Sequence, residues 1–158
     1  MKIKKIILAR QTNFILALLL IHFVFFGYLS NVKFDGQYKN IGEGVLFLYQ
    51  VLFNPQSYLS AIILAGIVFL MAFREKFFEY GIRNSIWLVP FIIVQSWIWY
   101  WFIIESFDIT IIGGYFLRIE SYFTILTLLG LNIFIAIIAS IARTKYDAFI
   151  SRVKNIEV

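Results

Sequence analysis

The chain has 158 residues, of which 61% are hydrophobic and 15% are charged, and its formal net charge is +5. Soluble domains average roughly 45–50% apolar and about 25% charged residues, so this composition indicates a helical membrane protein. The absence of cysteine excludes disulfides and thiol catalysis, and a single histidine argues against a zinc centre. We therefore expect no enzyme activity, no cofactor and no metal site. We attribute the excess of basic residues to membrane orientation, with no direct binding of nucleic acid.

The first predicted membrane span covers residues 12–30. It follows a basic N-terminal segment, it is longer than the apolar core of a signal peptide, and no small-residue cleavage site follows it. The polar residues 31–40 after this span are predicted to form an external loop.

Residues 41–53 are apolar but too short to cross a bilayer. Their apolar side chains recur at helical spacing, at Ile41, Val45, Leu48, Tyr49 and Leu52. Pro55 ends the segment, because the residue before a proline is pushed out of the α conformation. We expect a short external helix that lies in the membrane interface or re-enters the membrane.

Two apolar runs, 57–73 and 86–104, predict a transmembrane hairpin with a charged turn at 74–83. Each run approaches the ~20 residues that a helix needs to cross ~30 Å of hydrocarbon. Asn84 or Ser85 is expected to cap the start of the second run.

A fourth span is predicted over residues 120–142, and the distribution of basic residues orients all four spans. Four Lys or Arg precede the first span, three lie in the hairpin turn and four follow the last span, whereas the opposite side carries three. Because Lys and Arg accumulate on the cytoplasmic side, both termini are predicted to lie in the cytoplasm. The expected fold is an all-α integral membrane protein, a single domain over 1–158, with four transmembrane helices and one short external interfacial helix.

Three polar residues fall near the predicted midplane of the bilayer: His22, Gln95 and Asn132. Polar side chains at this depth face the interior of a helix bundle. In one interpretation they form hydrogen bonds between helices. In the other they line a pore, a proton path or a polar ligand site. We favour hydrogen bonding, because no acidic residue lies within the hydrocarbon to receive a proton from His22.

The predicted cytoplasmic segments combine basic and aromatic side chains. If the helix over 57–73 continues past Phe73, then Glu75, Glu79 and Arg83 lie on one of its faces. Aromatic and arginine side chains dominate binding hot spots, so we predict a partner site on the turn and the tail. Its residues are Arg74, Lys76, Phe77, Phe78, Glu79, Arg83, Arg143, Lys145 and Tyr146. The alternative is that these residues only fix orientation and contact anionic lipid headgroups.

The hairpin turn also carries a family resemblance. A basic segment after the second span leads to Glu79-Tyr80-Gly81 and, four residues later, to Ser85 at the start of an apolar run. The Gly-rich lead-in Ile41-Gly42-Glu43-Gly44 precedes another apolar stretch. These motifs resemble RexB, the membrane protein of the lambda Rex exclusion system. In size and plan the chain is also similar to KwaA, the membrane subunit of the Kiwa antiphage system.

The resemblance implies an oligomeric protein of the bacterial inner membrane that acts with a cytoplasmic DNA-binding partner. In the Kiwa-like version, which we favour, the protein senses infection at the membrane and recruits or controls that partner. In the RexB-like version it is a small ion channel that depolarises the membrane. A third interpretation is a structural accessory subunit of a larger membrane complex. We expect a homo-oligomer, with a tetramer favoured, because small residues are spaced for helix contact at Ala61, Ala65, Ala136 and Ser140.

Overall fold

The computed structural model describes residues 2–28, 44–53 and 58–156 of the chain. Every regular element in these ranges is helical, so the predicted all-α fold class is confirmed there. In chain order the elements are α1 (Lys2–Leu20), the π-helical segment η1 (Ile21–Gly27), the 3-10 turn η3 (Gly44–Leu46), α3 (Phe47–Phe53), α4 (Tyr58–Arg74), α5 (Phe78–Ile104), α6 (Thr110–Tyr115) and α7 (Ile119–Ile156).

Two helices are long and apolar enough to cross a membrane, Phe78–Ile104 and Ile119–Val153. The helices α3 and α4 pass the same test as a pair and are bent by 96° at the break between them, which makes a third candidate span. The apolar part of the first helix, Gln11–Gly27, is shorter. By length and composition, the described residues therefore contain two or three candidate spans of a membrane protein.

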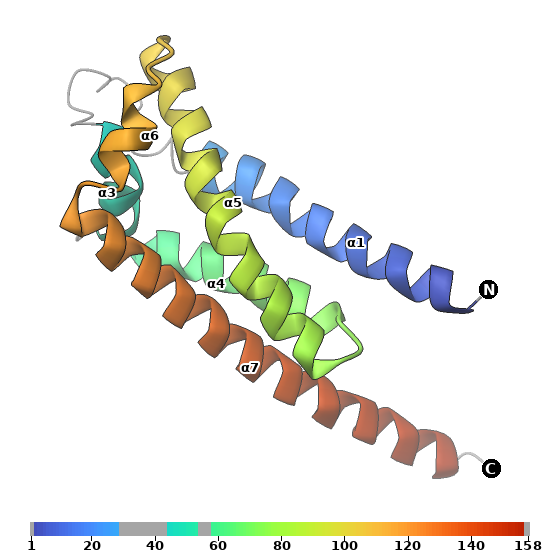
Figure 1. Ribbon diagram of the computed structural model, residues 1–158. Coiled ribbons are helices and arrows are strands. Elements are labelled where there is room, and N and C mark those ends of the chain that lie inside the picture. Colours follow the sequence, from blue (N-terminus) through green and yellow to red (C-terminus); the bar gives the residue numbers. More distant parts are fainter. Residues whose placement is uncertain (1, 29–43, 54–57, 157–158) are drawn as a thin grey trace.

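The helices α4 and α5 form the central pair, with α1 on one side and α7 on the other (Figure 1). The contacts among α4, α5 and α7 bury apolar side chains almost completely, at Leu64, Val68, Leu88, Ile92 and Leu128. Within hydrocarbon such contacts hold helices together through close packing, because lipid tails are as apolar as leucine. The central pair thereby fixes where the turn between α4 and α5 lies relative to the long helix α7.

The loop expected over 31–40 and the first face residue, Ile41, lie outside the described residues, and over 44–53 the expected apolar face is only partly correct. Phe47, Leu48 and Val51 are buried, whereas Tyr49 is half-buried. The reason is that α3 packs against α4, α5 and α7, so more than one of its faces is covered. Its Phe47 ring lies 6.5 Å from the ring of Phe26 in η1. This short helix is therefore packed against the other helices of the bundle.

The condition for a shared face of Glu75, Glu79 and Arg83 is not met, because the helix over 57–73 ends one residue after Phe73. The helix α4 ends at Arg74, and α5 begins at Phe78 after Phe77, whose backbone is extended with φ −114° and ψ 130°. The carboxylates of Glu75 and Glu79 therefore do not share a helical face. The expected cap at residues 84 and 85 is wrong for the same reason, since both lie inside α5.

The last helix is longer than the predicted fourth span. It extends as α7 from Ile119 to Ile156, so the basic tail after residue 142 continues the same helix. A further short helix, α6, lies between α5 and α7 and was not expected from the sequence. Its Tyr115 is buried against the Trp97 ring of α5, with the ring centroids 5.6 Å apart. The tail is therefore a helical continuation of a membrane-length helix.

Candidate functional site: a basic and aromatic end of the bundle

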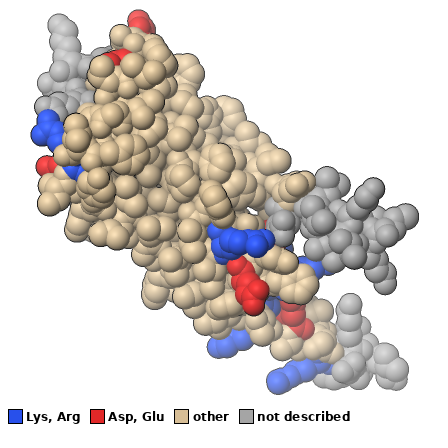
Figure 2. Space-filling view, in the orientation of Figure 1, with Lys and Arg blue, Asp and Glu red and all other residues tan. Residues whose placement is uncertain are grey.

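Both ends of the chain and the turn between α4 and α5 lie at the same end of the molecule (Figure 1). Figure 2 shows that Lys and Arg side chains gather at this end of the visible face, with acidic side chains among them. A broad uncharged surface separates them from the charges at the opposite end. The arrangement is that of a helix bundle with one polar, cation-rich end.

The end of α4 and the tail of α7 meet through Arg143. Its guanidinium carbon lies 5.6 Å from the ring centre of Phe73 and 5.9 Å from that of Tyr146. The two rings are 5.9 Å apart. Arg143 Nε also forms an ion pair of 2.9 Å with Asp147 Oδ2. Cation–π contacts contribute about 0.5–1 kcal/mol each at exposed sites, so this cluster holds the end of α4 against α7.

A second aromatic cluster stands on the turn itself. The rings of Phe77 and Tyr80 meet edge to face at 5.5 Å, and the Arg83 guanidinium lies 4.7 Å from the centre of the Tyr80 ring. Phe77 is 53% exposed and Phe78 is 50% exposed. Large aromatic side chains at the surface need either membrane headgroups or a partner protein to cover them.

Most of the residues predicted to bind a partner are exposed at this end. Arg143 is half-buried, whereas the side chains of the others are exposed: Arg74, Lys76, Phe77, Phe78, Glu79, Arg83, Lys145 and Tyr146. We call these nine residues the basic–aromatic surface. Six of the nine residues lie between positions 74 and 83, and three lie between 143 and 146. The structure brings these two groups together, because α7 packs along both α4 and α5.

A buried polar cluster lies beneath this surface and was missed from the sequence. Glu75 is 7% exposed, and its Oε1 accepts hydrogen bonds from Asn13 Nδ2 at 3.3 Å and Asn84 Nδ2 at 3.4 Å. The three residues come from α1, the turn and α5, so the carboxylate links three elements. No local pattern separates Glu75 from the exposed Glu79 four positions later, because both stand in one charged segment.

The three polar residues predicted near the midplane each have a partner on another helix or helical segment. His22 Nδ1 accepts a hydrogen bond of 3.2 Å from Trp99 Nε1. Gln95 Nε2 donates to the Leu18 carbonyl at 3.3 Å. Asn132 Nδ2 donates to the Ser85 carbonyl at 3.1 Å. His22 lies in the π-helical segment, where such irregularities are frequently functional, yet its ring is engaged by a tryptophan.

These three pairings lie at different heights along α5. Their α5 members are Ser85, Gln95 and Trp99, and a helix rises 1.5 Å per residue, so the first two are about 15 Å apart and the last two about 6 Å. The Asn132 pairing therefore lies apart, whereas the Gln95 and His22 pairings are neighbours on the contact between α5 and the first helical segment. Among the described residues, no group of three or more His, Cys, Asp or Glu could hold a metal ion.

At the opposite end of the bundle, Asp108 is an acidic side chain with hydrogen-bond partners. Asp108 Oδ1 accepts hydrogen bonds from the Thr110 hydroxyl at 2.6 Å and the Thr110 backbone N–H at 2.9 Å. These two bonds, the hydroxyl first, hold the pKa of Asp108 below its ordinary value. The bonds favour the start of α6, and this geometry is that of a turn and not of an acid–base site.

Comparison of the chain with protein-family models, with curated proteins and with solved structures found no match. The fold and the charged end define the class of protein as an all-helical membrane protein.

Proposed function

We propose that the chain is a four-span protein of a bacterial inner membrane, with both termini in the cytoplasm, that binds a soluble partner through its basic–aromatic surface. The observation that carries this proposal is the cluster in which Arg143 of α7 lies over Phe73 and Tyr146. It joins the end of α4 to α7 across 70 positions of the chain, beside the exposed rings of Phe77, Phe78 and Tyr146.

Four spans require that the first helix also crosses the membrane. Its apolar part, Gln11–Gly27, has 17 residues, which is the lower limit for a membrane-spanning helix. The helix begins at the same end as the other basic segments, as expected if this end lies in the cytoplasm. The four proposed crossings are then the first helix, the bent pair of α3 and α4 as one span, α5 and α7.

The basic–aromatic surface has the residue types that bind proteins. Arginine and aromatic anchors contribute most of the binding energy at interfaces, and basic groups speed encounter with an acidic partner. The chain is not expected to bind nucleic acid itself, because the same basic residues are those that orient a membrane protein. A partner that binds DNA would instead be held at this surface.

The resemblance to the membrane subunits of Kiwa and Rex gives the proposal its biological setting. On that basis the protein senses phage infection at the inner membrane and recruits or controls a cytoplasmic DNA-binding partner. The channel alternative is weaker, because His22, Gln95 and Asn132 each have a hydrogen-bond partner inside the chain, although the buried amide oxygens of Gln95 and Asn132 have none among the described residues. The third alternative, a structural accessory subunit of a larger complex, predicts no antiphage effect.

We also propose a homo-oligomer, with a tetramer favoured. Two of the small residues expected at its interface, Ala136 and Ser140, are buried within the subunit at 0% and 6% exposure. They therefore serve the packing of α7 inside the chain. Ala61 and Ala65 of α4 are half-buried and remain the candidates for contact between subunits.

Capture of the product of the adjacent gene tests the partner proposal. The full chain is purified with that protein and compared with Arg74→Glu, Phe78→Ala and a chain that ends at Arg143. The matched control is Phe102→Ala, because Phe102 is an exposed aromatic residue at the far end of α5. We expect each of the first three to lose capture while the control retains it. Undiminished capture by all three would refute the proposed surface.

A plaque assay on cells that express both genes then tests the defence setting. The wild-type pair should reduce plaque formation, and the variants that lose capture should lose this protection. Protection that persists without capture would separate the antiphage effect from the surface.

A further inference from the structure

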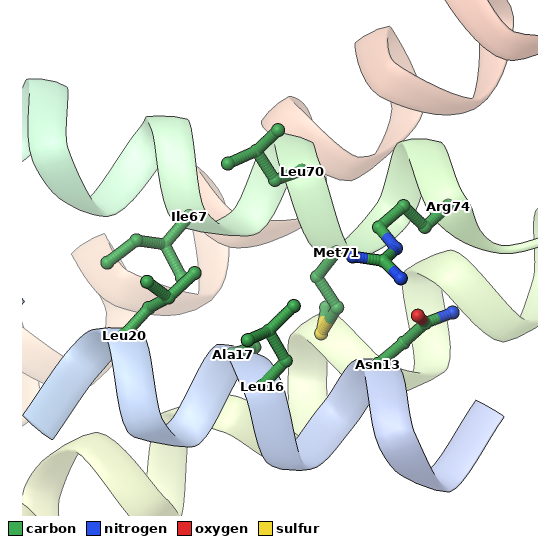
Figure 3. Close-up of a pocket in the computed structure, with 8 residues that line it drawn as sticks. All are labelled: Asn13, Leu16, Ala17, Leu20, Ile67, Leu70, Met71 and Arg74. Carbon is green, nitrogen blue, oxygen red and sulfur yellow. The ribbon is translucent and has the colours of Figure 1, made fainter. Parts of the chain in front are cut away.

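A hollow opens between α1 and α4, next to the end that carries the basic–aromatic surface (Figure 3). Its volume is ≈ 60 Å³, several times the ~10–15 Å³ that a single water occupies on this scale. Six of the residues that line it are apolar: Leu16, Ala17, Leu20, Ile67, Leu70 and Met71. Such a lining favours a hydrocarbon chain over water.

One end of the hollow is polar. Figure 3 shows the Arg74 guanidinium and the Asn13 amide near each other at one end, with the apolar side chains along the rest. The neighbouring carboxylate of Glu75 is buried and accepts from Asn13 and Asn84. Among the residues that the structure describes, Arg74 has no ion-pair partner. A cation thus stands at the mouth of an apolar groove.

The hollow is open to its surroundings along the side of the bundle. Leu16 is 37% exposed and Leu70 is 54% exposed, so both walls have an accessible rim. In a membrane, the medium against this rim is lipid. Basic pockets between helices at the cytoplasmic side bind phospholipid headgroups, and a guanidinium pairs with phosphate through two parallel hydrogen bonds.

We propose that this hollow binds one anionic phospholipid. Its phosphate contacts Arg74 next to the Asn13 amide, and one acyl chain lies along Leu16, Leu20 and Leu70. A second copy of the chain is the poorer occupant, because basic side chains gather at this end of the molecule and two such ends repel each other. The proposal does not depend on the partner protein, although Arg74 belongs to both surfaces.

Native mass spectrometry of the full chain in detergent tests the proposal, with phosphatidylglycerol and phosphatidylcholine added at equal concentration. We expect the wild type to retain one phosphatidylglycerol per subunit in preference to phosphatidylcholine. Arg74→Gln should weaken this retention about fivefold, the effect of one basic residue at a membrane surface. The matched control is Arg83→Gln, which removes the same charge from the same end but does not line the hollow.

A second pair of variants tests the apolar part of the hollow without a change in charge. Leu70→Trp fills the groove from its rim, whereas Ile62→Trp adds the same ring at an exposed position of α4 outside the hollow. We expect loss of the lipid with the first and retention with the second. Equal retention of the two lipids by the wild type, undiminished binding by both Arg74→Gln and Leu70→Trp, or oligomers without bound lipid would each overturn the proposal. The last result would assign the hollow to a second copy of the chain.

Discussion

Asn13 and Glu75 are 62 positions apart in the chain, and Asn13 Nδ2 donates a hydrogen bond of 3.3 Å to Glu75 Oε1. The bond ties the first helix to the turn between α4 and α5. The same carboxylate oxygen receives Asn84 Nδ2 from α5 at 3.4 Å. The exposed basic–aromatic surface is therefore built on a buried polar cluster that contains none of its nine residues.

Replacement of Glu75 by alanine should destabilise the protein. It leaves the buried amides of Asn13 and Asn84 without their acceptor, and an unsatisfied buried group costs about 1–3 kcal/mol. The control is Glu79→Ala, because Glu79 is exposed on the same turn. Thermal unfolding in detergent, followed by the fluorescence of the four tryptophans, measures the difference. Equal midpoints for the two variants would contradict a structural role for the buried cluster.

A larger side chain at Gly81 should also destabilise the bundle. A Cβ atom at this position would lie 3.2 Å from Ser140 Oγ and 3.5 Å from Ala72 Cβ, so α5 approaches both α4 and α7 there. We expect Gly81→Leu to cost about 1–3 kcal/mol, as overpacking of a tight interior does. Gly66→Leu is the control, since a Cβ at Gly66 meets nothing within 4 Å. The two variants should differ in unfolding midpoint, and a stable Gly81→Leu would show that the helices separate easily there.

The apolar runs of the sequence predicted the long helices but not the short α6, because residues of a membrane helix satisfy their backbone hydrogen bonds within the segment. The burial of the Glu75 side chain was not predictable, since it depends on a hydrogen bond from Asn13. That residue lies on a different helix, 62 positions earlier in the sequence. The early start of α5 at Phe78 was missed because charged and aromatic residues of the turn carry no apolar periodicity. Burial on several sides of α3 likewise follows from its neighbours and not from its own pattern.

The candidate surface was predicted from charge and residue type, but the contact between its halves was not. Arg143, Phe73 and Tyr146 meet only because α7 packs along α4 beyond the predicted end of the last span. Sequence spacing contains no information on such contacts between helices.

The absence of cysteine from the chain allows topology to be measured with single substitutions. We expect Ser106→Cys and Gly36→Cys to react with a membrane-impermeant maleimide in cells with an opened outer membrane. Ser151→Cys should react only after the inner membrane is permeabilised, because α7 carries it to the end that we propose to be cytoplasmic. Labelling of Gly36→Cys before the inner membrane is permeabilised would show that the first helix crosses that membrane. If Ser106→Cys and Ser151→Cys both reacted before the inner membrane was permeabilised, or both only afterwards, the two ends of the bundle would not lie on opposite sides of that membrane.

Planar bilayers should show little spontaneous conductance for the purified protein. The reason is that His22, Gln95 and Asn132 each have a partner within the chain and Asn132 lies apart from the other two, so the three do not line one polar path. Currents measured before and after the His22→Ala substitution provide the comparison. Spontaneous currents that disappear in His22→Ala would favour the channel alternative.

Site-specific photo-crosslinking in living cells tests the central claim most directly. A photoreactive phenylalanine analogue replaces either Tyr146 or Tyr122 in the full chain, with the product of the adjacent gene present. The two tyrosines are matched at 50% and 52% exposure and lie toward opposite ends of α7. We expect a crosslink to the partner from position 146 and none from position 122. A crosslink from position 122 alone, or equal yields from both positions, would contradict a cytoplasmic partner bound at the basic–aromatic surface.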